Sequence, residues 1–326
     1  MSAFQRSRRH ALLAASGSLA MGRAWAQSAY HERPVRLVVG YPAGGAVDIV
    51  ARTLGQSLSA SMGQPFIVEN KPGAGTNIAV RSVIDAAPDG HTLMLAANAL
   101  AANMALYKPA PFDAERDLAL IAQVGRVPVV IAANTSAPYD TVAQLVAAAR
   151  AKPASVAYAT PGNGATPHMA MALFARTAGI DLQHVPYRGG SQAITDTIGG
   201  QVPLVAVNAL EALPHVRSGK LKVIATLSAN RTRIFPDAPT IAESGHPGFE
   251  ASVWYGLVAP AATPAPIVGR LYAEVQKALA TPEVRERLTA VGGDVTPAGS
   301  THFAALVRSE RQRYDKLVQD TGIKPD

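Results

Sequence analysis

Two stretches of the chain place glycines between an apolar run and an Ala-rich helical pattern: LVVGYPAGGAVDIVAR at 37–52 and SVAYATPGNGATPHMAMALF at 155–174. Each pattern predicts a strand, a glycine-containing loop and the start of a helix. The first backbone N–H groups of a helix have no intrahelical partner, and the aligned peptide dipoles make that end partly positive. Because glycine lets a ligand approach the backbone closely, both junctions predict an anion site that needs no catalytic residue.

The loop sequences favour a carboxylate over a nucleotide phosphate. Neither loop contains the Gly-Lys-Ser/Thr of a P-loop, and neither fits the six-position dinucleotide fingerprint. In open parallel sheets, ligands bind at the carboxyl ends of strands, which is where these loops are expected. Two such loops could hold one acid or the two ends of a diacid. Either loop could instead be a tight turn between a strand and a helix.

Enzyme chemistry is the least favoured interpretation of the sequence. The chain has no cysteine, and therefore no thiolate nucleophile and no cysteine-ligated metal. It also lacks a Gly-x-Ser-x-Gly nucleophile elbow and a His-Glu-x-x-His motif. His168 has no second His, Asp or Glu at metal-ligand spacing. We expect no catalytic residue, no metal and no cofactor.

Short β-like runs alternate with helical patterns along the chain. Strands are predicted at 35–39, 65–69, 92–97, 128–133, 156–160, 202–208, 221–227 and 253–259. This alternation predicts an α/β fold with parallel sheets covered by helices on both faces. Thr141 and Gln144 predict a capping box, and 300–321 predicts a long amphipathic helix. No flexible linker is apparent, so two domains would be joined by crossing strands near 126–131 and 248–254.

The first 26 residues have the pattern of a signal peptide. A basic start precedes the apolar stretch ALLAASGSLAMG, and AWA at 24–26 predicts cleavage after Ala26. General secretion is favoured slightly over the twin-arginine route. The peptide holds four of the 30 Lys and Arg and no acid, which leaves 26 against 23 Asp and Glu. That small excess predicts no nucleic-acid partner. The mature protein is expected outside the cytoplasm.

From residue 30 onwards the chain resembles the Bug-type extracytoplasmic solute receptors, the binding proteins of tripartite tricarboxylate transporters. The likeness is carried by PVRLVVGYPAGGAVDIVARTLGQSL, VENKPGAGTNIAVRSVIDAAPDGHTLMLA, YATPGNGATPHMAMALF and HVPYRGGSQAITDTIGGQV, and by PDAPTIAESGHPGFEASVWYGLVAP near the C-terminus. The resemblance implies a two-domain, hinged periplasmic-binding-protein (Venus flytrap) fold. Each domain would be a mainly parallel sheet flanked by helices, with the ligand cleft between them. Domain 1 would comprise 27–127 and 250–326, and domain 2 would comprise 128–249.

The resemblance also implies a function and a set of site residues. The expected function is periplasmic capture of a small carboxylate or related polar metabolite for a membrane permease. The alternative is a sensor that presents its ligand-bound form to a sensor kinase, and in either case a monomer is expected. The family positions correspond here to Tyr41, Gly44, Gly45, Asp48, Gly162, Asn163, Gly164, Ala165, His168, Tyr187, Arg188 and Gly189. Ala165 and Val207 depart from the usual serine and aspartate, which implies a less polar pocket.

Several of these side chains have two possible roles. Asp48 could compensate the helix dipole, order its loop or contact a ligand donor. His168 could line the cleft or pack beneath the loop. Arg188 could bind a carboxylate or form an ion pair at the surface or between the domains. Tyr41 and Tyr187 could form cleft walls or simply pack. Three asparagines that end or follow apolar runs could bond ligand or backbone: Asn98, Asn103 and Asn208.

Overall fold

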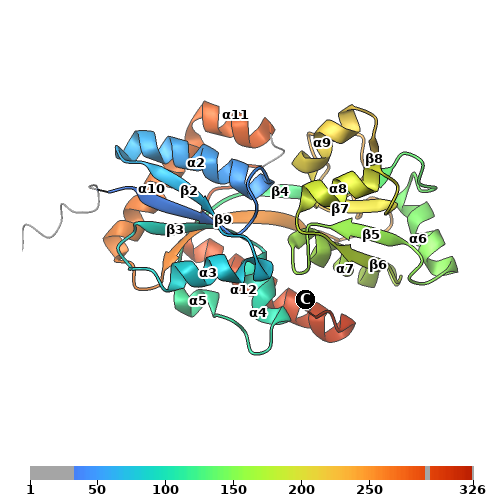
Figure 1. The fold of residues 1–326 in the computed structure, drawn as a ribbon, viewed down its shortest axis with the longest axis horizontal. Coiled ribbons are helices and arrows are strands. Elements are labelled where there is room, and N and C mark those ends of the chain that lie inside the picture. The colour runs from blue at the N-terminus through green and yellow to red at the C-terminus, as the bar shows by residue number, and fades with distance from the viewer. Residues whose placement is uncertain (1–32, 291–293, 325–326) are drawn as a thin grey trace, which may run out of the picture.

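The computed structural model describes residues 33–290 and 294–324, so the predicted signal peptide lies outside the described residues. Within that range the chain forms two lobes that lie side by side and are joined through long strands (Figure 1). The strands are β1 (Val35–Val39), β2 (Phe66–Asn70), β3 (Thr92–Ala97), β4 (Leu118–Asn134), β5 (Ala157–Thr160), β6 (Gln183–Pro186), β7 (Leu204–Asn208), β8 (Leu221–Thr226), β9 (Ser252–Pro260) and β10 (Ala298–Gly299). The helices are α2 (Ala46–Met62), η4 (Ala74–Thr76), α3 (Asn77–Ile84), α4 (Ala99–Leu106), α5 (Ala114–Asp117), α6 (Val142–Ala151), α7 (Thr166–Ala178), α8 (Gly190–Ile198), α9 (Ala209–Arg217), α10 (Ala265–Ala280), α11 (Pro282–Ala290) and α12 (Ser300–Thr321).

The first lobe is built on the strand order β2-β1-β3-β9-β4, with β10 on β4. The second lobe continues from β4 through β7, β5 and β6, with β8 also paired to β4. Pairs β1–β2, β1–β3, β5–β6 and β5–β7 are parallel. Strands β4 and β9 pair antiparallel with each other and with their other main neighbours. The α/β class is confirmed, and the sheets are mixed rather than mainly parallel because β4 and β9 run between the lobes.

The lobes are joined where β4 changes partners. Its first part, Leu118–Pro128, pairs with β9, and from Val129 onwards it pairs with β7 in the second lobe. A second connection lies beside it, where the Ala251 N–H donates to the Leu227 carbonyl at 2.7 Å just before β9 begins. An ion pair of 2.8 Å between Arg126 and Glu250 ties the two connections together. The chain thus passes between lobes within both segments predicted to cross, and the domain limits at 127/128 and 249/250 remain our proposal.

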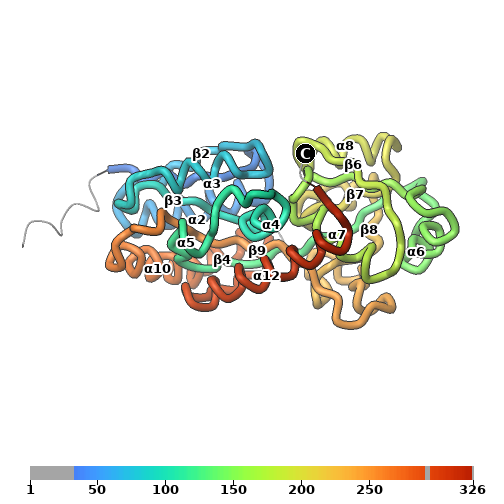
Figure 2. Tube along the Cα trace, turned by 90° about the horizontal axis from the view of Figure 1, so that it is seen from below, coloured from blue at the N-terminus to red at the C-terminus, as the bar shows by residue number. Residues whose placement is uncertain are grey.

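The predicted C-terminal helix is confirmed as α12, which runs beneath the sheets in Figure 2 and ends beside α7. It buries Phe303, Val307, Tyr314 and Leu317. The Phe303 ring lies directly on β9, since a Cβ at Gly256 would come within 2.1 Å of the ring. This helix therefore needs glycine in the strand above it, which explains why the ring can be fully buried.

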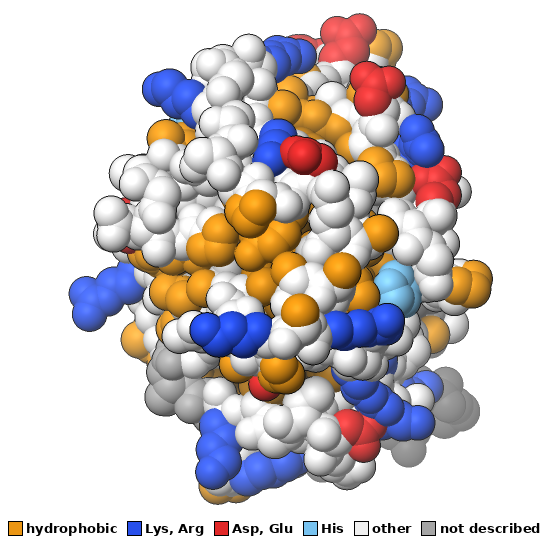
Figure 3. All heavy atoms as spheres, turned by 90° about the vertical axis from the view of Figure 1, so that its right-hand side faces the viewer, with side chains coloured by type: hydrophobic (Ala, Val, Ile, Leu, Met, Phe, Trp, Pro, Cys, Tyr) orange, Lys and Arg blue, Asp and Glu red, His pale blue; other side chains and the backbone are white. Residues whose placement is uncertain are grey.

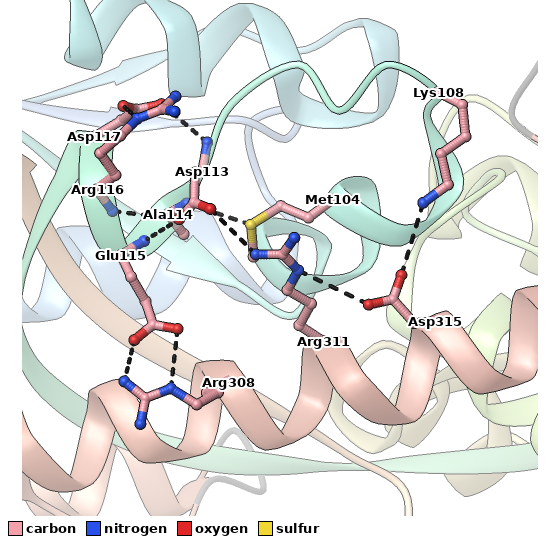
Figure 4. A network of polar contacts seen from close by, with 10 residues as sticks. All are labelled: Met104, Lys108, Asp113, Ala114, Glu115, Arg116, Asp117, Arg308, Arg311 and Asp315. Atoms are coloured by element: carbon pink, nitrogen blue, oxygen red, sulfur yellow. Dashed lines mark hydrogen bonds and ion pairs between the residues drawn. The ribbon is translucent and has the colours of Figure 1, made fainter.

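Charged pairs hold the exposed side of α12 against the segment around α5 (Figure 4). Arg308 pairs with Glu115, and Arg311 lies 3.2 Å from Asp113. Pairs this exposed each contribute only about 0–1 kcal/mol. They fix where the helix docks, while its apolar face supplies most of the stabilisation.

The outer end of the second lobe, seen in Figure 3, has hydrophobic side chains gathered near its middle with Lys and Arg around them. The large exposed hydrophobic residues in the described part of the chain are Ile67 and Ile78, and both belong to the first lobe. The patch therefore consists of small or partly buried side chains. None of the helices between residues 33 and 324 that the structure describes could cross a membrane.

Candidate ligand-binding site

The first junction is ordered by an acid of its own helix. Helix α2 starts after Gly45, and Gly44 adopts a positive φ of 82°. Asp48 is 2% exposed, and its carboxylate accepts hydrogen bonds of 2.9 Å from the Gly44 N–H, Arg52 and Asn70. Burial alone would raise the pKa of Asp48, but these hydrogen bonds together lower it. Asp48 thus orders the loop as an anion and does not line the cavity described below.

The second junction has the same construction but is ordered by a neutral group. Gly162 and Gly164 adopt positive φ angles of 141° and 70°, and α7 begins after them. The Gly164 N–H donates to Nδ1 of His168 at 3.1 Å. The His168 ring stacks on His184 with centroids 3.8 Å apart. Burial, with His184 beside it, lowers the pKa of His168 to about 3, so this imidazole supports the loop from beneath without charge.

A cavity of about 300 Å³ lies between the lobes. Its walls include the N-terminal turns of α2, α7, α8 and α9, together with residues of β9 where it leaves the hinge. Each of those turns presents backbone N–H groups that lack intrahelical partners. The lining residues are Tyr41, Pro42, Ala43, Gly45, Ala46, Val47, Ala97, Pro161, Ala165, Thr166, Pro167, Arg188, Gly189, Gly190, Ser191, Gln192, Asn208, Glu211, Val253 and Tyr255.

A second cavity of about 450 Å³ adjoins the first and shares Tyr41, Ala165 and Arg188 with it. Gly162, Asn163 and Tyr187 line this second cavity, opposite the turn Gly73–Thr76 of the first lobe. Arg188 is exposed and forms no ion pair with any described residue. Its guanidinium is therefore available to a carboxylate at the boundary of both cavities.

The structure brings most, but not all, of the predicted residues to these walls. The predicted residues that line one or both cavities are Tyr41, Gly45, Gly162, Asn163, Ala165, Tyr187, Arg188, Gly189 and Asn208. Those that order the loops from behind are Gly44, Asp48, Gly164 and His168. This second group lines neither cavity, and its polar groups bond one another, so direct ligand contact by these residues stays a prediction.

Two of the predicted asparagines lie elsewhere. Asn98 is 1% exposed; it donates to the Ser252 carbonyl and to Glu310, and accepts from the Trp254 N–H at 2.8 Å. Asn103 donates to the Gly75 carbonyl at 2.6 Å and so holds the turn in the first lobe. Both bond the protein rather than the cavity, since each sits where α4 packs against neighbouring backbone.

Sequence reasoning missed five polar residues of the 300 Å³ cavity: Thr166, Ser191, Gln192, Glu211 and Tyr255. The Glu211 carboxylate accepts from the Ala46 N–H and from Asn208, which connects α9 of one lobe to the start of α2 in the other. Burial raises its pKa. Its position three residues after Asn208, in the first turn of a helix, was an available signal. Tyr255 gave none, because it lies within an apolar strand pattern.

The described residues contain no group of three His, Cys, Asp or Glu side chains arranged to hold a metal ion. The cavity offers backbone amides, hydroxyls, the side-chain amides of Gln192 and Asn208, one guanidinium and one carboxylate. Such a set can orient and release a small polar molecule. It shows no nucleophile activated by a neighbouring base.

Two hinged α/β lobes around a largely apolar cavity with a few convergent polar groups define a solute-binding protein of the Venus flytrap type. The chain belongs to the tripartite tricarboxylate transporter family receptors, whose family model matches residues 50–323. It is 35% identical over 297 residues to BugT of Bordetella pertussis, which covers 90% of this chain and 91% of that protein.

Solved structures agree with this assignment. One is a Rhodopseudomonas palustris protein, MatC, with bound malate: TM-score 0.81, 32% identity, covering 88% of this chain and 99% of that one. Another is the R. palustris protein Rpa4515 with adipate: TM-score 0.84, 30% identity, covering 90% and 99%.

Proposed function

We propose that this protein captures a small carboxylate in the periplasm and presents it to a membrane permease of the tripartite tricarboxylate type. The observation that carries the proposal is the convergence of the N-terminal turns of α2, α7, α8 and α9 on one interlobe cavity. Helix N-termini favour anions, and Arg188 adds a positive charge that is not neutralised by the described residues. The malate and adipate held by the two structural relatives are carboxylates of suitable size.

The carboxylate is proposed to bind at the second junction, between the start of α7 and Arg188. There the Gly164 N–H is held by a neutral imidazole, so no protein anion competes for the helix end. Hydrogen bonds to a charged group contribute about 1.5–3 kcal/mol each. Micromolar affinity corresponds to about 8 kcal/mol. Several such hydrogen bonds are therefore needed, because the costs of ordering the protein and the ligand are subtracted from their sum.

Thermal unfolding of residues 27–326 with mono-, di- and tricarboxylates, amino acids and aromatic acids tests the capture step. A ligand at 100 times its Kd adds about 2.7 kcal/mol of stability, which raises Tm by a few degrees for a chain of this size. A flat panel, with nothing found by native mass spectrometry in the purified protein, would contradict the proposal.

The permease partnership needs a cellular test. Uptake of the labelled ligand by cells lacking this protein should fall and should return when the gene is restored. Normal uptake with a lost transcriptional response to the same ligand would instead favour the sensor alternative. A sedimentation measurement with and without ligand tests the proposed monomer.

A further inference from the structure

The 300 Å³ cavity contains one carboxylate of the protein itself, on Glu211, and that group occupies a place where a ligand anion would otherwise bind. It accepts the Ala46 N–H at the start of α2. A Cβ built on Gly45 would lie 3.7 Å from its Oε1, and one built on Gly190 would lie 2.4 Å from its Oε2. The carboxylate therefore sits between the first turns of α2 and α8 and already compensates both positive helix ends.

Three polar atoms at this end of the cavity, one of them an oxygen of the carboxylate itself, have no hydrogen-bond partner among the described residues. Glu211 Oε2, Asn208 Oδ1 and the Tyr255 hydroxyl are buried and make no hydrogen bond to any part of the chain that the structure describes. Asn208 is 8% exposed and Tyr255 is 1% exposed, and all three residues line the cavity. Because the Asn208 side chain donates its N–H to Glu211, its oxygen must face away and is an unused acceptor.

A ligand group that donates hydrogen bonds would therefore satisfy the unpaired atoms at this end of the cavity. A carboxylate oxygen and an amide oxygen can only accept, and a tyrosine hydroxyl can accept as well as donate. The Glu211 charge and burial both raise the pKa of Tyr41 and Tyr255, burial being the larger cause; the two phenols therefore lie close to the carboxylate and stay neutral. Aromatic rings beside an anion suit a cationic or N–H-bearing group. A second carboxylate on the ligand would be repelled by the buried Glu211 carboxylate, because water screens the two negative charges only weakly there.

We propose that the ligand carries, at the end opposite its carboxylate, an ammonium or primary amide that donates to Glu211, Asn208 and Tyr255. Glu211 is then the residue that selects an amino acid or acid amide over a dicarboxylate. The inference rests on the proposed function, since it assumes that a carboxylate binds between α7 and Arg188.

Matched ligands test the selection directly. Calorimetry on residues 27–326 compares glutarate with glutaramate and 4-aminobutyrate, and adipate with adipamate and 5-aminopentanoate. Within each length the ligands differ chiefly in the group facing Glu211. We expect an N–H-bearing member to bind at least tenfold tighter than the dicarboxylate of its set.

Two variants separate the role of Glu211 from a general loss of folding. Glu211→Gln replaces an acceptor by a donor and should shift the ratio of affinities at least tenfold towards the dicarboxylate. Gly190→Ala keeps the charge but places a Cβ where Oε2 now lies, so it should weaken the preference in the same direction. Glu283→Gln removes an acid in the first turn of α11, 73% exposed, and should leave the ratio unchanged.

The outcomes distinguish this inference from the proposed function. Dicarboxylates that bind the unaltered protein as tightly as their partners, or tighter at lower pH, would overturn the inference while leaving carboxylate capture intact. A ratio that Glu211→Gln does not change would also overturn it. If no carboxylate of either set or of the wider panel binds, the proposed function fails and the inference fails with it.

Discussion

The two strand–glycine–helix junctions have the same backbone construction and opposite chemistry. At the first junction, carboxylates accept hydrogen bonds from backbone N–H groups that lack intrahelical partners: Asp48 accepts from Gly44, and Glu211 accepts from Ala46. At the second, a neutral His168 holds the Gly164 N–H and Arg188 stands nearby. Similar helix ends can therefore form two chemically opposite ends of one cavity, which we call its poles. The first pole, at the first junction, carries carboxylates, and the second pole, at the second junction, carries Arg188.

The change expected to alter most properties at once is one that breaks the approach of the second junction to the first lobe, because it affects both stability and affinity. A Cβ on Gly164 would lie 3.0 Å from Leu106 and 3.3 Å from Asn103, both on α4 of the first lobe. Gly164→Ala should lower ligand affinity at least tenfold, about 1.4 kcal/mol, because the lobes can no longer approach this closely. Calorimetry measures the affinity, and small-angle scattering measures lobe closure.

Gly179→Ala is the matched control for that variant. Gly179 ends the same helix at a similar positive φ, 61°, with nothing within 4 Å of its Cβ position. Both variants should lose about 1–2 kcal/mol of stability from the unfavourable φ, but only Gly164→Ala should lose affinity. Equal affinities in the two variants would contradict the cross-lobe contact.

The neutral His168 predicts a loss of stability in acid. Its pKa is about 3 in the folded state and about 6.5 when unfolded, so between these values only the unfolded chain binds the proton. The free energy of unfolding should fall by about 1.4 kcal/mol for each pH unit below 6.5. His168→Gln should flatten this slope in urea titrations from pH 7 to 4.5. An unchanged slope would mean that other groups cause the acid sensitivity.

Removing the charge at the second pole tests the position of the ligand carboxylate. Arg188→Gln should weaken binding by about 1.5–3 kcal/mol, or roughly tenfold to a hundredfold, with little change in Tm of the free protein. Arg217→Gln, at an exposed position on α9 of the same lobe, should leave affinity unchanged. Equal losses in both would indicate a long-range charge effect rather than a contact.

The smallest effect is expected at the first junction. Asp48→Asn removes the charge that the Gly44 N–H and Arg52 bind and should cost about 1–2 kcal/mol at pH 7. Because folding lowers the pKa of Asp48, its stabilisation is present above the unfolded pKa and is lost as pH falls through the folded one. The variant should differ least from the parent in strong acid, as denaturant unfolding can show. A constant difference at all pH values would contradict this role.

Much of the fold follows from local pattern, and the exceptions have a physical cause. Strands β1 and β3 have the predicted limits, and the Thr141–Gln144 capping box is present. The first part of β4 was not predicted, because Gln123, Gly125 and Arg126 interrupt its apolar pattern and no local signal shows that one strand serves both lobes. Antiparallel pairing of β4 and β9 depends on distant partners, which no local period encodes.

For the site, the sequence predicted the position of the two loops, but not the hydrogen-bond partners of their residues. Glycines mark the junctions because positive φ is needed there, so both could be found. Which polar side chain accepts from each backbone N–H depends on how the elements pack. His168 accepts from the Gly164 N–H beneath its loop, and Asn98 accepts from the Trp254 N–H. Glu211 of the second lobe reaches the start of α2 in the first lobe, a contact that depends on how the two lobes pack together.

A structure of residues 27–326 with the best ligand of the panel tests the account most directly. We predict that its carboxylate lies between the first turn of α7 and Arg188, within hydrogen-bonding distance of both, with the rest of the molecule in the 300 Å³ cavity. A carboxylate bound instead at the start of α2, with Glu211 displaced, would contradict the assignment of the two poles.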